Sequence, residues 1–350
     1  MSLLEQAINS IKPLDREAML KASERQNQLT KPAGSLGVLE EISIKLAGIT
    51  GKVKNGVERK TVIVMAGDHG VTDEGVSAYP KEVTPQMVMN FVNGGAAINV
   101  LARHVGANVI VVDVGVAAGI DDERVLSRKI RPGTANFAKE PAMTREEAVK
   151  AIEVGIEVAY KEADNGTHLL ATGDMGIGNT TASSAILAAL TGRRLDGLVG
   201  RGTGIDNRAL DHKRKVIENA IDLLKPDRND PLDVLAKVGG LEIAGLAGLI
   251  IGAAVRRIPV VIDGFISSAA ALVAGRIDSR VIDYMIASHV SVEPGHRLIL
   301  DELGLKPMLH MDMRLGEGTG AALAMTLVEA AAKIMNEMAT FSEAGVSDKS

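Results

Sequence analysis

Apolar segments that end beside an acidic residue and glycine, each followed by a helical pattern, most constrain the fold of this chain. Nearly continuous apolar runs at 61–66, 168–171 and 259–262 lead into Asp68, Asp174 and Asp263. Such runs are typical of parallel strands buried on both faces of a sheet. Helical patterns between them provide the crossovers that parallel strands require. We therefore expect an α/β fold: an open, mostly parallel sheet with helices on both faces.

The periodicity of apolar residues predicts where the elements lie in this Rossmann-like arrangement. Strands are expected at 61–66, 108–113, 168–171, 259–264 and 307–311. Helices are expected at 3–27 in two parts, with Pro13 opening the second, and at 38–49, 83–105, 144–163, 180–190, 207–224, 241–255, 266–275, 279–288, 294–303 and 321–335.

Three predicted helices precede the first strand, which suggests a division into two domains. We expect residues 1–58 to form a helical arm or subdomain, joined by the C-terminal helix of residues 321–350. Residues 59–320 would then form the α/β catalytic domain. The polar residues 341–350 are expected to be frayed.

Charge and composition exclude several classes of function. A net charge of −5 without a cluster of basic residues argues against nucleic-acid binding. The absence of cysteine excludes disulfides, cysteine-ligated zinc and thiol catalysis. The longest apolar run, residues 243–255, is too short to span a bilayer, and the N-terminus lacks the pattern of a signal peptide. We therefore expect a cytoplasmic protein that binds neither nucleic acid nor a membrane.

The first candidate for chemistry is Glu317, which stands between Gly316 and Gly318 after a predicted strand and before a predicted helix. Glycine neighbours leave space on both sides, so a flat substrate could approach the carboxylate closely. An ordinary glycine-rich turn is the alternative for this motif alone. However, acids end several predicted strands at the same edge of the sheet, where ligands of parallel sheets bind. Together they favour a site over a set of separate helix caps.

Residues 173–181, with the sequence Gly-Asp-Met-Gly-Ile-Gly-Asn-Thr-Thr, form a glycine-rich loop between a predicted strand and a predicted helix. Free backbone amides at such a helix start bind phosphate. The loop lacks the lysine of a P-loop and the spacing of a dinucleotide-binding fingerprint. Residues 200–204 could supply further amides, and Lys213 could neutralise a phosphate, although a solvated surface lysine is the alternative.

The segment 70–86 between a predicted strand and helix carries Tyr79, Pro80 and Gln86. An apolar loop over the strand ends could hold a flat ring, with Gln86 as its polar partner, or it could simply pack locally. The histidines show no paired spacing along the chain, so a metal site is not indicated.

Five stretches of the chain resemble nicotinate-nucleotide–dimethylbenzimidazole phosphoribosyltransferases, which make the lower-ligand nucleotide of cobalamin. They are KPAGSLG (31–37), AGDHGV (66–71), GGAAIN (94–99), GDMGIGNTT (173–181) and RLGEGTG (314–320). The resemblance runs in order over nearly the whole chain. It departs at Asp174, where well-known relatives carry glutamate, so the shorter side chain puts that contact in doubt.

The resemblance implies a role for each matching residue. Glu317 would be the general base. The phosphoribosyl group and nicotinate would be bound by Asp174, Gly176, Gly178, Asn179, Thr180, Gly202, Thr203, Lys213, Asp263, Arg314 and Gly316. The benzimidazole would lie against Tyr79, Pro80, Gln86, Met175 and Leu315. The family also implies a homodimer, with neither a metal nor a cofactor.

The expected reaction joins nicotinate mononucleotide and 5,6-dimethylbenzimidazole, giving α-ribazole 5′-phosphate and nicotinate with inversion at the anomeric carbon. A small-molecule kinase is an alternative, but it would require a phosphate-binding lysine that the glycine-rich loop lacks. A second alternative is a protein of the same fold that binds the nucleotide without consuming it. A diphosphate-dependent phosphoribosyltransferase is disfavoured because no pair of acids is followed by Thr-Gly-x-Thr.

Overall fold

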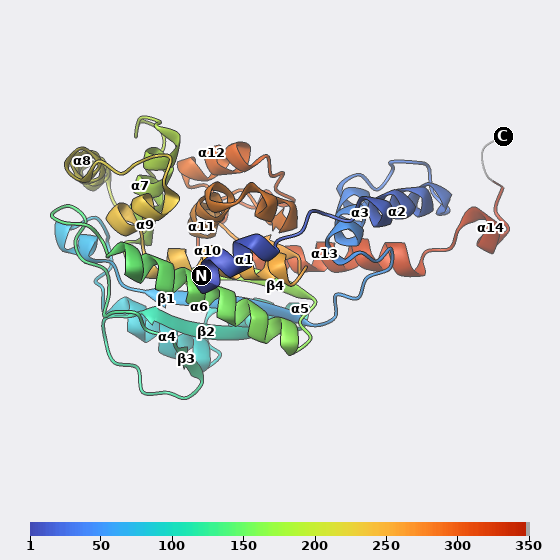
Figure 1. Ribbon diagram of the computed structural model, residues 1–350, viewed down its shortest axis with the longest axis horizontal. Coiled ribbons are helices and arrows are strands. Elements are labelled where there is room, and N and C mark those ends of the chain that lie inside the picture. The colour runs from blue at the N-terminus through green and yellow to red at the C-terminus, as the bar shows by residue number, and fades with distance from the viewer. Residues whose placement is uncertain (348–350) are drawn as a thin grey trace.

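The computed structural model describes residues 1–347, and within them the chain forms a six-stranded sheet with the order β3-β2-β1-β4-β5-β6 (Figure 1). The neighbouring strands pair in parallel. The strands are β1 (Lys60–Gly67), β2 (Ala107–Gly115), β3 (Val125–Ser127), β4 (Leu169–Met175), β5 (Val260–Ile262) and β6 (Met285–Ala287). The expected α/β class with a parallel sheet is confirmed.

The helices of the described residues fill the connections between these strands and extend beyond them. They are α1 (Leu3–Ser10), α2 (Arg16–Gln28), α3 (Val38–Thr50), α4 (Val83–Val92), α5 (Ala97–Val105), α6 (Arg145–Asp164), α7 (Asn179–Thr191), α8 (Asn207–Leu224), α9 (Pro231–Val238), α10 (Leu241–Val255), α11 (Phe265–Ile277), α12 (Pro294–Leu303), α13 (Thr319–Glu337) and α14 (Phe341–Ala344). Short 3₁₀ helices, η1 (Gly70–Glu74) and η2 (Ser279–Tyr284), complete the list.

Helices cover both faces of the sheet, as the apolar strands require. Successive side chains of a strand point to opposite faces. Ile63 and Met65 of β1 therefore join the core formed with α6, α10 and α11. Val62 and Val64 join the opposite core, which is formed with α4, α5 and α13.

Helices α2 and α3 and the C-terminal half of α13 pack together and extend away from the sheet (Figure 1). Helix α1 instead packs on α6 and α10, beside the sheet. The boundary between residues 58 and 59 as a domain division stays a prediction. No helix among the described residues is both long enough and apolar enough to cross a membrane.

Several predicted elements were wrong in their boundaries or in their type of secondary structure. The helix expected at 83–105 is broken into α4 and α5 at Gly94, which has φ +77°. The helix expected at 279–288 is η2 followed by β6. The strand expected at 307–311 is a single bridge between Leu309 and His289. Strand β3 and helix α9 were not expected.

The two ends of the chain also differ from expectation. Helix α2 begins after Asp15, whose side chain accepts a hydrogen bond from the Ala18 amide at 2.9 Å, so Pro13 lies in the connection before it. The C-terminal tail forms the turn α14, which Thr340 caps through a reciprocal pair of bonds with Glu343. The rest of the expected frayed tail, residues 348–350, lies outside the described residues.

Candidate functional site

A cavity of about 670 Å³ opens at the carboxyl edge of the sheet. The predicted site residues that line it are Tyr79, Asp174, Met175, Gly176, Gly178, Asn179, Thr180, Gly202, Thr203, Arg314, Leu315, Gly316 and Glu317. Asp263 and Lys213 lie directly behind its wall, both almost fully buried. Pro80 and Gln86 do not line this cavity, and the Gln86 side chain is exposed.

Glu317 lies in a turn and has a backbone conformation that is rare for residues other than glycine. Gly316, Glu317 and Gly318 have φ angles of +83°, +63° and +93°, in the left-handed region. The turn passes close over β4, because a Cβ on Gly173 would lie 2.5 Å from the Glu317 carbonyl oxygen. One Glu317 carboxylate oxygen accepts a hydrogen bond from the Ile98 amide at 3.2 Å, and burial raises the pKa of Glu317. The result is a fixed carboxylate of increased basicity at the cavity wall.

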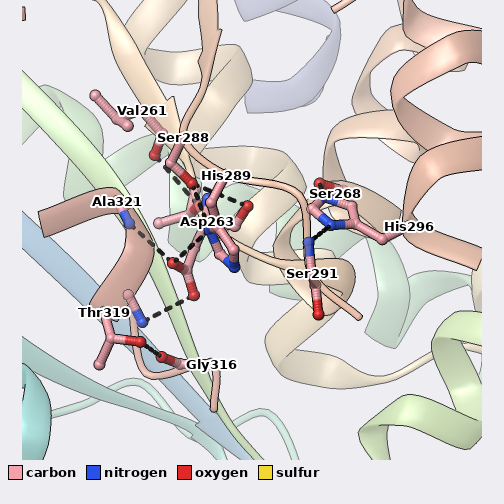
Figure 2. A network of polar contacts seen from close by, with 12 residues as sticks. Val261, Asp263, Ser268, Ser288, His289, Ser291, His296, Gly316, Thr319 and Ala321 are labelled. Carbon is pink, nitrogen blue, oxygen red and sulfur yellow. Dashed lines mark hydrogen bonds and ion pairs between the residues drawn. The ribbon is translucent and has the colours of Figure 1, made fainter. Parts of the chain in front are cut away.

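Asp263, at the end of β5, supports this turn from behind (Figure 2). Its carboxylate oxygens accept hydrogen bonds from the amides of Gly318, at 3.2 Å, and Ala321, at 2.9 Å. Its own amide donates to Thr172 Oγ1 at 3.1 Å. A carboxylate in this position stabilises the start of α13. Asp263 therefore positions the turn that carries Glu317.

Asp174 is the second-to-last residue of β4 and lines the cavity beside that turn. Its Oδ2 accepts a hydrogen bond from Asn179 at 3.0 Å, whereas Oδ1 is buried without a hydrogen-bond partner among the described residues. Burial first, and then the charges of Asp263 and Glu242, raise the pKa of Asp174 well above its usual range. The neutral carboxylic acid is consequently favoured here.

Lys213, on α8, reaches the start of α7 just beyond the glycine-rich loop. Its Nζ donates to Thr180 Oγ1 at 2.8 Å and to the Gly200 carbonyl at 3.4 Å. The residue is 1% exposed, so the alternative of a solvated surface lysine is wrong. Burial lowers the pKa of Lys213 to about 8. A cation and the free amides of a helix start thus meet at one place, which is the chemistry of a phosphate site.

Gly202 and Thr203, from the segment 200–204, form a second wall of the cavity and connect its two sides. Thr203 Oγ1 accepts a hydrogen bond from the Ala78 amide at 2.9 Å, which ties this wall to the loop that carries Tyr79. Arg314 donates to the Gly202 carbonyl at 3.0 Å. The segments singled out in the sequence are therefore linked to one another around a single cavity.

Comparisons with known proteins show the family of this chain. A family model described as phosphoribosyltransferase matches residues 11–346. This chain belongs to that phosphoribosyltransferase family. A relative from Chloroflexus aggregans, named nicotinate-nucleotide–dimethylbenzimidazole phosphoribosyltransferase, is 62% identical over 100% of this chain and 99% of its own length. A relative of the same name from a Geobacter species (strain M21) is 57% identical over 99% of both chains.

A solved structure of the family shares the fold. The crystal structure of CobT from Thermus thermophilus superposes with a TM-score of 0.92 at 50% sequence identity, covering 95% of this chain and 100% of that chain. The resemblance inferred from the five sequence stretches is therefore confirmed.

Among the residues of this phosphoribosyltransferase's cavity that escaped the sequence reasoning are three polar ones: His289, Ser291 and Glu293. They follow β6, a strand that we expected to be helical. Glu293 accepts a hydrogen bond from the Gly202 amide at 2.9 Å, and its other oxygen is buried without a hydrogen-bond partner among the described residues. A signal was present, because the apolar residues 284–287 lead into polar residues just as the other strands do.

His289, which lines the cavity, lies close to a second histidine, His296 (Figure 2). His289 Nδ1 lies 2.9 Å from Ser288 Oγ and 4.0 Å from Asp263 Oδ1. His296 lies 2.9 Å from Ser268 Oγ and accepts a hydrogen bond from the Ser291 amide at 2.8 Å. Within residues 1–347 no three His, Asp or Glu side chains are grouped so that they could hold a metal ion.

Proposed function

We propose that this phosphoribosyltransferase transfers the phosphoribosyl group of nicotinate mononucleotide to 5,6-dimethylbenzimidazole. The products would be α-ribazole 5′-phosphate and nicotinate, in the synthesis of the cobalamin lower ligand. The observation that carries the proposal is Glu317, a buried carboxylate on a fixed turn in the same cavity as the glycine-rich loop. The names of the relatives support the choice of both substrates.

The first step of the proposed mechanism is the binding of the nucleotide phosphate. Amides of the glycine-rich loop at the start of α7 would bind its oxygens, apart from those of Ile177 and Asn179, which donate to Thr84 Oγ1 and to the Gly176 carbonyl. Lys213 would neutralise its charge. This fixes the ribose between the glycine-rich loop and the turn at Glu317. Asp174, Asn179, Gly202, Thr203, Asp263, Arg314 and Gly316 would complete or support the phosphoribosyl and nicotinate site.

In the chemical step a ring nitrogen of the benzimidazole attacks the anomeric carbon as the bond to the nicotinate nitrogen breaks. The bonding pair leaves with nicotinate, whose ring nitrogen loses its positive charge. The benzimidazole N–H proton passes to Glu317, whose raised pKa makes it a better acceptor. Attack from the face opposite to the leaving group inverts the configuration.

We place the benzimidazole against Tyr79, Met175 and Leu315, which line the cavity. Pro80 and Gln86 lie outside that lining, so a role for them requires the loop to shift when the base binds. We also propose that the protein acts as a cytoplasmic homodimer. The resemblance to the family, which implies a homodimer, supports this proposal.

A metal-free assay tests the proposed reaction. The protein is mixed with nicotinate mononucleotide and dimethylbenzimidazole in EDTA, and nicotinate release is followed by chromatography. Release that depends on the added base supports base exchange. If calorimetry shows nucleotide binding but no nicotinate is released, the protein is a binding protein or uses another acceptor. If neither binding nor release occurs, the proposed substrate is wrong.

A further inference from the structure

A buried ion pair, His69 with Glu242, lies directly beneath the glycine-rich loop and has no part in the mechanism above. His69 follows β1, and Glu242 lies in the first turn of α10. His69 Nε2 and Glu242 Oε1 are 2.6 Å apart, and both side chains are 0% exposed. Neither side chain lines the cavity, so neither contacts a substrate directly.

Glycines from three separate segments allow the backbone to close around this pair. A Cβ on Gly176 would lie 3.3 Å from both Glu242 Oε1 and His69 Nε2. A Cβ on Gly240 would lie 2.4 Å from His69 Cε1, and one on Gly67 would lie 3.1 Å from Glu242 Oε2. The backbone of each segment is therefore in close contact with the pair.

The His69 side chain lies under more than one residue of the loop. A Cβ on Gly178, the residue that caps α7, would lie 3.2 Å from His69 Cβ. Gly176 and Gly178 thus both rest on His69. Their amides belong to the group that would bind the nucleotide phosphate, so the position of the pair sets the position of those amides.

The energetics of the pair suggest a role beyond packing. Burial alone would lower the pKa of His69, but the adjacent Glu242 carboxylate raises it. Within the described residues His69 Nδ1 and Glu242 Oε2 have no hydrogen-bond partner. Apolar side chains of similar volume often serve stability as well as a buried ion pair does. Stability alone therefore does not account for the pair.

We propose that His69 and Glu242 are positioning residues that hold the glycine-rich loop in its phosphate-binding conformation. The inference rests on the proposed function only in naming the nucleotide, since phosphate binding can be measured without any reaction. Loss of the pair moves the loop amides away from the phosphate. It leaves Glu317 and the chemical step in place.

The test is Glu242→Gln, which keeps the shape of the side chain and removes its charge. We expect the KM for nicotinate mononucleotide to rise about tenfold while kcat stays within about threefold. The Kd of inorganic phosphate, measured by calorimetry, should rise by a similar factor. The matched control is Glu162→Gln, because Glu162 is also buried but bonds Thr167 and Asn165 at the opposite edge of the sheet.

If Glu242→Gln does not fold, His69→Asn is measured in the same way, since its shorter side chain cannot reach Glu242 Oε1. An unchanged KM and phosphate Kd, an equal change in the control, or a fall in kcat alone overturns the positioning role. Weaker phosphate binding in the variant, together with no base exchange by the native protein, retains the positioning role and rejects the proposed reaction.

Discussion

At the scale of single residues, the turn around Glu317 shows how a backbone conformation can support a reaction. The left-handed φ of Glu317 is costly for a residue with a side chain. That cost is offset by Asp263, which bonds the amides that follow the turn. The carboxylate is therefore held in place before substrate arrives, which is the arrangement that general-base catalysis favours.

Replacement of Glu317 by Gln tests the general-base role. We expect turnover to fall by about 10²–10⁴-fold, because an amide cannot accept the proton. The Kd of nicotinate mononucleotide should stay nearly unchanged, since the phosphate is bound elsewhere. Steady-state rates and calorimetry measure the two quantities. Near-normal turnover would assign the proton to another group.

The pH dependence of nucleotide binding tests Lys213. Its pKa of about 8 means that the ammonium loses its proton as pH rises through that value. The KM of the nucleotide should therefore rise above pH about 8 and be steady between about 6.5 and 7.5. Lys213→Met should have a high KM at every pH. A rise of the same size in Lys213→Met would attribute the pH dependence to a different group.

The site residues differ in how far the sequence could predict them. Glu317 and the glycine-rich loop could be found because glycine beside a polar residue at a strand end is a local signal. The burial of Lys213 could not be predicted, because α8 is charged along most of its length and tertiary packing alone encloses that one side chain. His69 stood in a noted motif, but its partner Glu242 lies 173 residues away.

At the scale of elements, strong apolar runs predicted the structure, and short or interrupted segments did not. Helix α6 begins where Thr144 and Glu147 form their capping box. The break between α4 and α5 is also local, because Asn99 accepts a hydrogen bond from the Ala96 amide and starts a new helix. β6 has three residues, too few for a period to distinguish strand from helix.

The contact between α6 and α10 explains why the latter helix is rich in glycine. A Cβ on Gly155 would lie 1.9 Å from the Gly245 carbonyl oxygen, and one on Gly248 would lie 1.8 Å from the Ile152 carbonyl oxygen. The two backbones are thus in direct contact on one face of the sheet. The Glu242 carboxylate stands at the start of the same helix α10, so this packing also supports the site.

Gly248→Ala tests this packing. The added methyl group must push two helices apart, so we expect a loss of about 1–3 kcal/mol or more in the free energy of unfolding. Urea denaturation measures the change. Gly119→Ala is the matched control, because no described atom lies within 4 Å of that Cβ and its φ is not positive. Equal stability of the two variants would show that the helices can separate freely.

At the scale of the whole molecule, the fold buries acidic side chains at the site, and burial disfavours their ionised form. Burial raises the pKa values of Asp174, Asp263 and Glu317. A carboxyl with a raised pKa in the folded state contributes less stability once the pH exceeds its unfolded pKa, because the unfolded chain then releases its proton more readily. These acids therefore reduce stability at neutral pH, in return for a reactive cavity.

Asp174→Asn separates stability from function. The amide stays neutral at every pH and can still accept the hydrogen bond from Asn179. We expect the variant to be more stable than the native protein by about 1 kcal/mol or more at pH about 7.5. The gain should shrink as pH falls toward about 4 and disappear below it, where the aspartate is protonated in both states. Activity should fall, because Asp174 lines the cavity.

Thermal unfolding at a series of pH values measures this effect, and Asp121→Asn serves as the control because that aspartate is exposed. The control should show no comparable gain at any pH. A gain in Asp174→Asn that is the same at acid and neutral pH would mean that packing, and not ionisation, causes it. A loss at neutral pH would mean that the aspartate is stabilised as a carboxylate in the folded protein. The buried acid would then increase the free energy of unfolding, and the site would not reduce the stability of the fold through Asp174.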